Sequence, residues 1–208
     1  MKALLIIDLQ NDFLPGGPLQ VPHGDEIIPV INNIQKSFRI IVATRDWHPV
    51  NHGCFASNHE GKSPGDVIKL NGQRQTLWPD HCVQGSPGAE ISPLLNQALI
   101  NNFIFKGSDP DIDSYSAFYD NGHLKETGLH SYLKRNGITA LYITGLASEY
   151  GVYHTVKDAL LLGYETYVVV DATKGVNLEK DDTKKALADM EKRGAVLITS
   201  SDIGKRVS

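Results

Sequence analysis

The sequence alternates short apolar runs with longer segments of helical spacing, and this alternation constrains the fold more than any other feature. The apolar runs are nearly continuous, as in strands that are buried on both faces, and they cover residues 3–8, 39–44, 102–106, 140–145, 166–171 and 195–199. Helical spacing covers residues 25–37, 91–99, 124–135, 148–162 and 180–193, and Gly194 follows the last segment as a C′ glycine. This order predicts a doubly wound, mostly parallel α/β sheet with helices on both faces.

The bulk properties of the 208 residues are those of one globular domain, which we expect to span residues 1–208, since no linker or repeat divides the chain. The net charge is −4, and the scattered Lys and Arg residues favour neither nucleic acid nor a membrane surface as a partner. The first apolar run ends at Asp8 and is shorter than the roughly 7–15 residues of a signal peptide, so we expect a cytoplasmic protein. Cys54 and Cys82 lie far apart, which favours free thiols in a reducing compartment. The sequence leaves open whether the protein forms a homo-oligomer.

The segment 45–90 departs from the alternation. It is rich in His, Pro, Gly and Asn and shows no clear period. Unstructured loops of this length are uncommon inside compact domains and are usually functional. We therefore expect this segment to contribute to a binding site.

Polar residues follow the predicted strands at the points where each strand ends. They are Asp8, Asp46 with His48, Lys106, the segment 145–151, and Asp171. Ligands of open α/β sheets bind beyond the carboxyl ends of the strands. We therefore expect these groups to converge at one edge of the sheet.

Two of these polar residues, together with two further histidines of the long segment, have the spacing of a metal site. Asp46, His48 and His52 lie within seven residues, and His81 follows in the same long segment. A carboxylate and two imidazoles suit Zn, Fe or Mn and leave positions open for water or substrate. The alternative is a polar loop whose histidines cap turns.

Asp8 ends a buried strand, and Lys106 ends another. A buried carboxylate must be paired or hydrogen-bonded, and a lysine partner would keep it ionised and available as a base. A buried salt bridge without a chemical role explains the same two residues. Asp12 has a simpler explanation, because with Asn11 it can form turns, and we do not expect it in the site.

The helix predicted after residue 147 presents free backbone N–H groups at its start. Those of Ala147 and Gly151 could bind a developing oxyanion. Glycine costs a helix about 1 kcal/mol relative to alanine, so Gly151 needs a reason. One reason is close packing of two elements. Phe13, Trp78 and the 113–118 segment offer aromatic surface nearby, which suits a flat ligand.

The motifs IIDLQNDFLPGG, ATRDWHPVNHGCFAS, WPDHCVQGSPGAE, FKGSDPDIDSYSAF and TGLASEYGV occur in this order along the chain. Together they resemble the nicotinamidase/pyrazinamidase family of isochorismatase-like hydrolases over essentially the whole chain. The resemblance implies a three-layer α/β/α fold with a six-stranded parallel sheet. It also implies hydrolysis of nicotinamide to nicotinate and ammonia, a reaction of NAD salvage.

The resemblance also implies roles for the residues that match these motifs. Asp8 would be the acid and base, Lys106 its cationic partner, and Ala147 an oxyanion-hole residue after a cis peptide bond from Leu146. The metal ligands would be Asp46, His48 and His81, with His52 a ligand in some relatives only. Phe13, Trp78 and Tyr115 would line the ring pocket. The ion would be zinc, with iron and manganese left open, and would bind the pyridine nitrogen.

The chain departs from the family at Gly151, where relatives carry the nucleophilic cysteine. Neither Cys54 nor Cys82 lies at the start of this helix. Three interpretations follow: an amidase altered at one position by engineering, a natural non-catalytic pyridine binder, or an enzyme that uses metal-bound water with Asp8 as base. An isochorismatase-type substrate is a further alternative, which the full metal motif disfavours. The preference among aromatic amides depends on the shape of the pocket.

Overall fold

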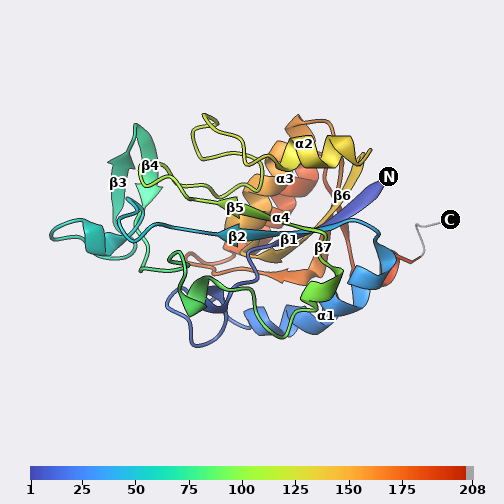
Figure 1. The fold of residues 1–208 in the computed structure, drawn as a ribbon, viewed down its shortest axis with the longest axis horizontal. Helices are drawn as coiled ribbons and strands as arrows, with labels where there is room; N and C mark the ends of the chain where they lie inside the picture. Colours follow the sequence, from blue (N-terminus) through green and yellow to red (C-terminus); the bar gives the residue numbers. More distant parts are fainter. Residues whose placement is uncertain (205–208) are drawn as a thin grey trace.

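A six-stranded parallel sheet forms the centre of the molecule, as the alternation of apolar runs predicts (Figure 1). The computed structural model describes residues 1–204. The strands of the sheet are β1 (Lys2–Ile7), β2 (Ile41–Asp46), β5 (Asn102–Lys106), β6 (Ala140–Leu146), β7 (Glu165–Lys174) and β8 (Val196–Ile198). Their order is β5-β2-β1-β6-β7-β8, and every neighbouring pair is parallel.

Both faces of the sheet are covered, which explains why its strands are almost continuously apolar. Along β1, Leu4 and Ile6 pack into one core cluster, whereas Leu5 and Ile7 pack into the other. Successive side chains of a strand point to opposite faces, so a strand between two helical layers has to be apolar at every position. The three-layer α/β/α arrangement is therefore confirmed.

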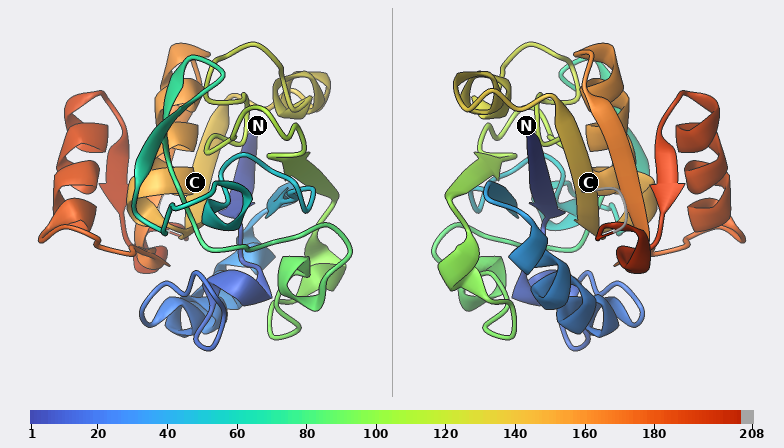
Figure 2. Two further views of the ribbon diagram at one scale, coloured as in Figure 1. Left: turned by 90° about the vertical axis from the view of Figure 1, so that its left-hand side faces the viewer. Right: turned by 90° about the vertical axis from the view of Figure 1, so that its right-hand side faces the viewer.

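Four α-helices form the outer layers: α1 (Ile28–Ile34), α2 (Leu129–Arg135), α3 (Tyr153–Leu161) and α4 (Asp182–Lys192). Helix α1 packs against one face of the sheet, and the other three pack against the opposite face (Figures 1 and 2). A π-helical turn, Ser148–Val152, leads into α3. Single 3₁₀ turns cover Asn11–Phe13, Gly24–Ile27, Gln35–Ser37, Ala56–Asn58, Pro87–Ala89, Gln97–Leu99 and Ser200–Asp202.

The helix predicted over residues 91–99 is wrong. Only the 3₁₀ turn Gln97–Leu99 is helical, and Ile91 instead forms an isolated bridge with Gln10. Pro93 disfavours helical geometry at the residue before it, which is the physical reason for the difference. The apolar spacing has a different cause. Ile91 and Leu95 lie in a loop, and their side chains are buried in the core.

The helix predicted over residues 124–135 is shorter than expected and begins at Leu129. The carboxylate of Asp120 accepts hydrogen bonds from the backbone N–H groups of Gly122, Leu124 and Lys125. Carboxylates near backbone donors compete with helix formation in this way. Residues 124–128 therefore form an irregular loop rather than a helix, and Glu126 makes an isolated bridge with Tyr119.

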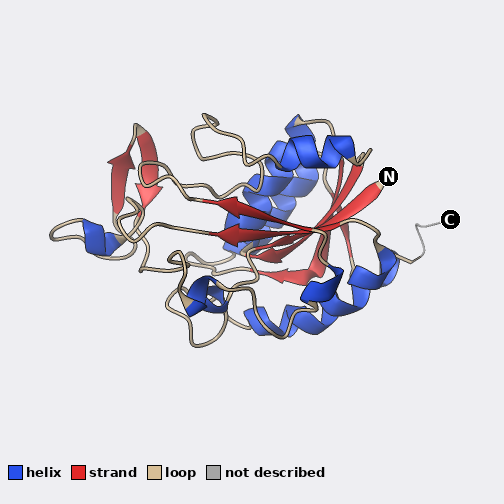
Figure 3. Cartoon of the chain, viewed as in Figure 1, coloured by secondary structure: helices blue, strands red, loops and turns tan. Residues whose placement is uncertain are grey.

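The long segment 45–90 contains a hairpin that its composition does not reveal. Strands β3 (Val67–Leu70) and β4 (Gln73–Thr76) pair antiparallel around Asn71 and Gly72, which both have positive φ. An Asn-Gly pair with this backbone is the strongest short hairpin signal. The hairpin stands away from the main sheet, on the side to which the arrowheads of β2 and β5 point (Figure 3).

Strand β7 is longer than expected, and this displaces one predicted site residue. The strand continues to Lys174, so Asp171 lies within it rather than at its end. Its carboxylate accepts hydrogen bonds from the backbone N–H and the hydroxyl of Ser200. Asp171 therefore joins β7 to the turn after β8 and does not reach the carboxyl edge. Gly194 has a φ of 111° directly after α4, as expected for a C′ glycine.

Within residues 1–204, the helices fall short of the length and apolarity that crossing a bilayer demands. A spanning helix needs about 20 predominantly apolar residues. The longest helix, α4, has 11 residues and carries several charges.

Gly145 provides a test of how closely the central strands pack. Its φ is 105°, and an added Cβ would lie 2.1 Å from the backbone oxygen of Ile7. Gly163 has a φ of 82° with no atom within 4 Å of such a Cβ. Gly163→Ala should therefore cost only the backbone penalty, about 1–2 kcal/mol, whereas Gly145→Ala should cost clearly more. Urea unfolding of both variants measures this difference, and equal losses would contradict the packing described.

Candidate active site

A cavity lies beyond the carboxyl ends of the central strands. Nine residues predicted from the sequence border it: Asp8, Phe13, Asp46, Trp78, His81, Lys106, Tyr115, Ala147 and Gly151. The sequence reasoning missed six others: Leu19, Val21, Asp113, Leu146, Tyr150 and Val176. Asp113 and Tyr150 lie inside motifs that we singled out. Leu19, Val21 and Val176 lie in loops without a period, where no pattern marks them.

A buried lysine joins two carboxylates at the floor of this cavity. The Nζ atom of Lys106 lies 2.8 Å from Oδ2 of Asp8 and 2.9 Å from Oδ1 of Asp46. It also donates to the backbone oxygen of Ser114 at 3.0 Å. The predicted pair of Asp8 and Lys106 is present, and Asp46 extends it. Three adjacent strands, β1, β2 and β5, therefore meet in one chain of charges.

The two carboxylates differ in their proton affinity. Burial raises the pKa of Asp8 to about 6, although the ammonium group of Lys106 opposes this shift. Burial acts in the same direction on Asp46, but Lys106 and His48 outweigh it and hold the pKa of Asp46 well below its usual range. Opposite charges favour the ionised form, and desolvation disfavours it. Asp8 is thus the carboxylate that can exchange a proton near neutral pH.

Hydrogen bonds fix the orientation of both carboxylates. Oδ1 of Asp8 accepts the hydroxyl of Thr44 at 2.5 Å. The backbone of Asp46 is held by Gln10, whose side-chain oxygen accepts the N–H of Asp46 at 2.7 Å. The amide nitrogen of Gln10 donates to the oxygens of Asp46 and Ala89 at 2.7 and 2.8 Å. Gln10 is fully buried, and the sequence reasoning missed it.

Asp46, His48 and His81 form a compact group of possible metal ligands. Their donor atoms all lie within 4.8 Å of one another, and all three side chains are buried. Nδ1 of His48 bonds to the oxygen of Gly107, and Nδ1 of His81 bonds to that of Pro79, each at 2.8 Å. Facing a carbonyl oxygen, each Nδ1 must carry the proton, which leaves each Nε2 free as a ligand atom.

The chemistry of this group fits a divalent ion. Nε2 of His48 is buried without a hydrogen-bond partner and lies 3.3 Å from Oδ2 of Asp46. Nε2 of His81 lies 3.7 Å from the same oxygen. Lone pairs directed at a shared point need a proton or a cation between them. A carboxylate and two neutral imidazoles are the donors that Zn, Fe and Mn accept.

His52 does not belong to this group. It belongs to a second group of buried side chains, with His48, Cys54 and Asp113. His52 does not border the cavity, whereas Asp113 does. Both cysteines are free and buried, and neither is among the described residues that line the cavity. Neither thiol can therefore replace a nucleophile at position 151. Burial raises the pKa of both thiols as well.

Aromatic rings form the walls of the cavity. Tyr150 lies edge to face with Trp78 and Tyr115, at centroid distances of 5.2 and 5.5 Å. The indole nitrogen of Trp78 donates to the hydroxyl of Tyr115 at 3.3 Å. On another side, the ring of Phe13 lies 5.5 Å from that of His81. These contacts fix the rings around a space that suits a flat ligand.

Gly151 occupies the turn between β6 and α3, directly beside Asp8. At the start of this turn, the peptide bond between Leu146 and Ala147 is cis, as the family resemblance implies. An added Cβ at Gly151 would lie 2.8 Å from Cγ2 of Ile7, 2.9 Å from the oxygen of Leu146 and 3.1 Å from Oδ2 of Asp8. Gly151 has no left-handed backbone that would require glycine. A side chain at this position would therefore require a shift of the turn or of these neighbours.

Asp12 lies outside the cavity, as expected, but it does more than form a turn. Its Oδ2 accepts the backbone N–H of Cys82 at 2.7 Å. Cys82 has a positive φ and follows His81. Asp12 therefore holds the loop that carries one of the possible metal ligands.

Comparisons with known proteins agree with this architecture. The sequence-family model of the isochorismatase domain matches residues 2–202 of this chain. The nicotinamidase of Escherichia coli K12 is 46% identical over 205 residues, which cover 97% of this chain and 96% of that protein.

Two solved structures are similar as well. A nicotinamidase/pyrazinamidase from Acinetobacter baumanii superposes with a TM-score of 0.94 at 44% identity and covers 97% of each chain. A pyrazinamidase from Pyrococcus horikoshii, solved in complex with zinc, gives a TM-score of 0.78 at 39% identity and covers 95% of this chain and 98% of its own. The chain therefore belongs to the isochorismatase family, in the group of amide hydrolases that contains the nicotinamidases.

Proposed function

We propose that this chain is a metal-dependent protein of the nicotinamidase type. It binds nicotinamide or a similar pyridine or pyrazine carboxamide, and its hydrolysis to nicotinate and ammonia is impaired by Gly151. One observation carries the proposal: the Asp8–Lys106–Asp46 chain lies at the floor of an aromatic cavity beside position 151. The 46% identity to a nicotinamidase over nearly the whole chain supports it.

Substrate binding uses the two ends of the cavity. Phe13, Trp78 and Tyr115 enclose the aromatic ring by apolar contact. Asp46, His48 and His81 hold one divalent ion, zinc by preference and iron or manganese as alternatives. When bound, this ion would supply a Lewis-acidic anchor for the ring nitrogen. The carboxamide then lies toward Asp8 and position 151.

Proton transfer is the role of Asp8. Its pKa of about 6 allows Oδ2 to accept a proton from a nucleophile and return it to the leaving ammonia near neutral pH. Lys106 holds that oxygen in place at 2.8 Å. The backbone N–H groups of Ala147 and Gly151, which border the same cavity, would stabilise the developing oxyanion.

The nucleophile is what this chain lacks. The family resemblance implies a nucleophilic cysteine at the position of Gly151, and without sulfur no thioester forms. A second candidate function is therefore a non-catalytic receptor for the same amides. The crowding at position 151 favours it, because an added Cβ would lie 2.8 Å from Cγ2 of Ile7 and 2.9 Å from the oxygen of Leu146, so the turn or these neighbours would have to shift.

The first test restores the sulfur. Gly151→Cys should raise ammonia release from nicotinamide by several orders of magnitude, because loss of a nucleophile costs about 10⁴–10⁶ in kcat. Gly151→Ala is the matched control, since it adds the same Cβ without the sulfur. An enzymatic ammonia assay compares both with the parent chain. If the two variants release ammonia at the same rate, position 151 is not that of the nucleophile.

Removing one ligand tests the metal site. His81→Ala should lower bound zinc to a small fraction of the parent value, because two remaining donors hold an ion poorly. His23→Ala is the control, since His23 is exposed and pairs only with Glu26. Elemental analysis after dialysis measures the metal. A zinc content that His81→Ala leaves unchanged would refute the ligand assignment.

Substrate binding can be tested without turnover. The metal-loaded parent should bind nicotinamide in calorimetry, and Trp78→Ala should weaken binding at least tenfold by removing a cavity wall. Trp47→Ala is the matched control, because the Trp47 ring packs on Phe105 outside the cavity. Absence of saturation at millimolar nicotinamide would count against both candidate functions.

A further inference from the structure

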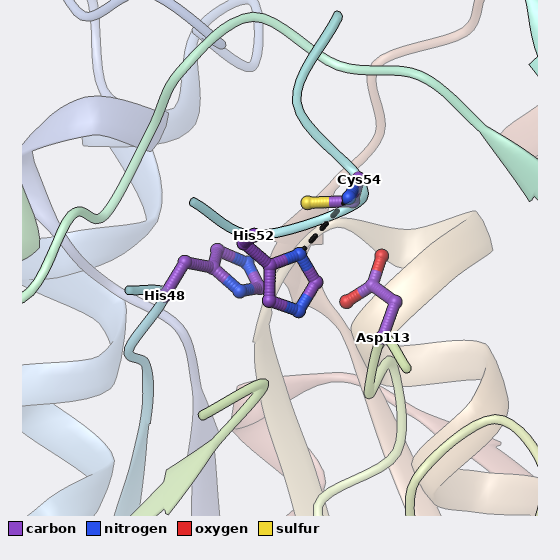
Figure 4. A group of neighbouring side chains, drawn as sticks. All are labelled: His48, His52, Cys54 and Asp113. Atoms are coloured by element: carbon purple, nitrogen blue, oxygen red, sulfur yellow. Dashed lines mark hydrogen bonds between the residues drawn. The ribbon is translucent and has the colours of Figure 1, made fainter. Parts of the chain in front are cut away.

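A second group of buried ligand-type side chains shares His48 with the first group (Figure 4). It comprises His48, His52, Cys54 and Asp113, and one donor atom from each lies within 4.8 Å of all the others. The first three side chains are fully buried, and Asp113 is 3% exposed. Such a concentration of polar groups in a protein interior is costly unless the groups satisfy one another or hold an ion.

Hydrogen bonds within the described residues leave this group only partly satisfied. Nδ1 of His52 accepts the backbone N–H of Cys54 at 3.0 Å, so Nδ1 carries the lone pair and Nε2 the proton of the neutral ring; this buried Nε2–H has no hydrogen-bond partner that meets the distance and angle criteria within residues 1–204. The carboxylate of Asp113 accepts from Gln75 and from Ser114, at 2.9 and 2.7 Å. A carboxylate offers about four lone pairs, so Asp113 keeps acceptor capacity.

His48 links this group to the ligands that face the cavity. Its Nδ1 donates to the oxygen of Gly107, so only Nε2 can bind an ion. Nε2 has no hydrogen-bond partner, and His48 belongs to both ligand groups. A single imidazole lone pair binds one ion at a time. The two groups therefore cannot both hold an ion through His48.

We propose that His48, His52, Cys54 and Asp113 form a second ion site that takes a thiophilic divalent cation such as Zn²⁺ or Cd²⁺. This site competes with the Asp46–His48–His81 group for His48. On binding, Cys54 loses its thiol proton to solvent, and the sulfur forms the bond to the ion. His52 joins through Nδ1 by giving up the hydrogen bond from Cys54. The inference goes beyond the proposed function, because it holds whether or not the chain hydrolyses an amide.

The composition of the site explains the preference for thiophilic ions. Thiolate sulfur selects zinc and its softer neighbours, whereas the cavity group offers only oxygen and nitrogen. A thiolate and the carboxylate of Asp113 would neutralise a 2+ ion.

The geometry of the site requires only small shifts. Donor atoms around a tetrahedral zinc ion lie about 3.3–3.8 Å apart, given bond lengths of about 2.0–2.3 Å. The donors here lie within 4.8 Å of one another, so none has to close by more than about 1.5 Å. Asp113 borders the cavity, whereas Cys54 and His52 do not, so Asp113 marks the route by which an ion would enter.

The consequence is inhibition by thiophilic ions. An ion in the inner site takes Nε2 of His48 away from Asp46 and His81. Those two residues alone hold an ion poorly at the cavity. The same metal ion would therefore support substrate binding at the Asp46–His48–His81 group and oppose it at the inner site.

The test is spectroscopic and uses the metal-free full chain. Titration with Co²⁺ or Cd²⁺ should produce a thiolate-to-metal charge-transfer band in the near ultraviolet. Cys54→Ser should abolish the band, whereas Cys82→Ser should retain it. The two cysteines are a matched pair, since both are free and fully buried. A parent chain without the band, or a band that persists in Cys54→Ser, would overturn the inference.

Two further variants separate the inner site from the cavity group. His81→Ala should keep the band, because His81 does not belong to the inner site. Asp113→Asn should weaken the apparent Cd²⁺ affinity at least tenfold, and it serves as the second variant if Cys54→Ser unfolds. Circular dichroism and thermal unfolding report the fold of each variant. Loss of the band in His81→Ala, or unchanged affinity in Asp113→Asn, would show that the sulfur serves another site.

Discussion

The buried chain of Asp8, Lys106 and Asp46 is the interaction on which the rest of the site depends. It connects the ends of β1, β5 and β2, because Nζ of Lys106 lies 2.8 Å from Oδ2 of Asp8 and 2.9 Å from Oδ1 of Asp46. Each charge would be costly alone in this interior, so the three groups require one another. This mutual dependence holds the proposed base Asp8, its counter-ion Lys106 and the proposed metal ligand Asp46 within a single unit. The cavity is the space that remains above that unit.

Periodicity predicted the parts of the structure that local sequence determines. All six strands follow from runs such as residues 3–8, because a strand covered on both faces must be apolar throughout. Asp8, Asp46 and Lys106 follow from their places after such runs. The same reasoning failed for residues 91–99. Their apolar residues are spaced as in a helix, but they are buried loop residues, and Pro93 disfavours a helix there. It failed for Asp171 because nothing local shows how far a strand extends.

The rest of the site could not be read from spacing, since it depends on contacts between distant segments. Gln10 holds Asp46 across 36 residues, and neither position carries a local signal of that bond. Gly151 is the clearest case. The family resemblance indicates that a sulfur is missing at this position. The structure adds that Ile7 and Leu146 leave little space for a Cβ there. Chemistry and packing both bear on this glycine, and only the coordinates reveal the second.

The hairpin β3–β4 has a consequence for how this architecture diversifies. Its residue Gln75 donates to the carboxylate of Asp113, and it lies 3.4 Å from the hydroxyl of Tyr115. An appendage outside the main sheet thus reaches both the aromatic wall and the inner polar group. Because the hairpin lies outside the parallel sheet, a change in its sequence would alter the surroundings of Asp113 and Tyr115 without breaking any strand pairing of that sheet. The pocket's ligand preference and the stability of the sheet therefore rest on different segments of the chain.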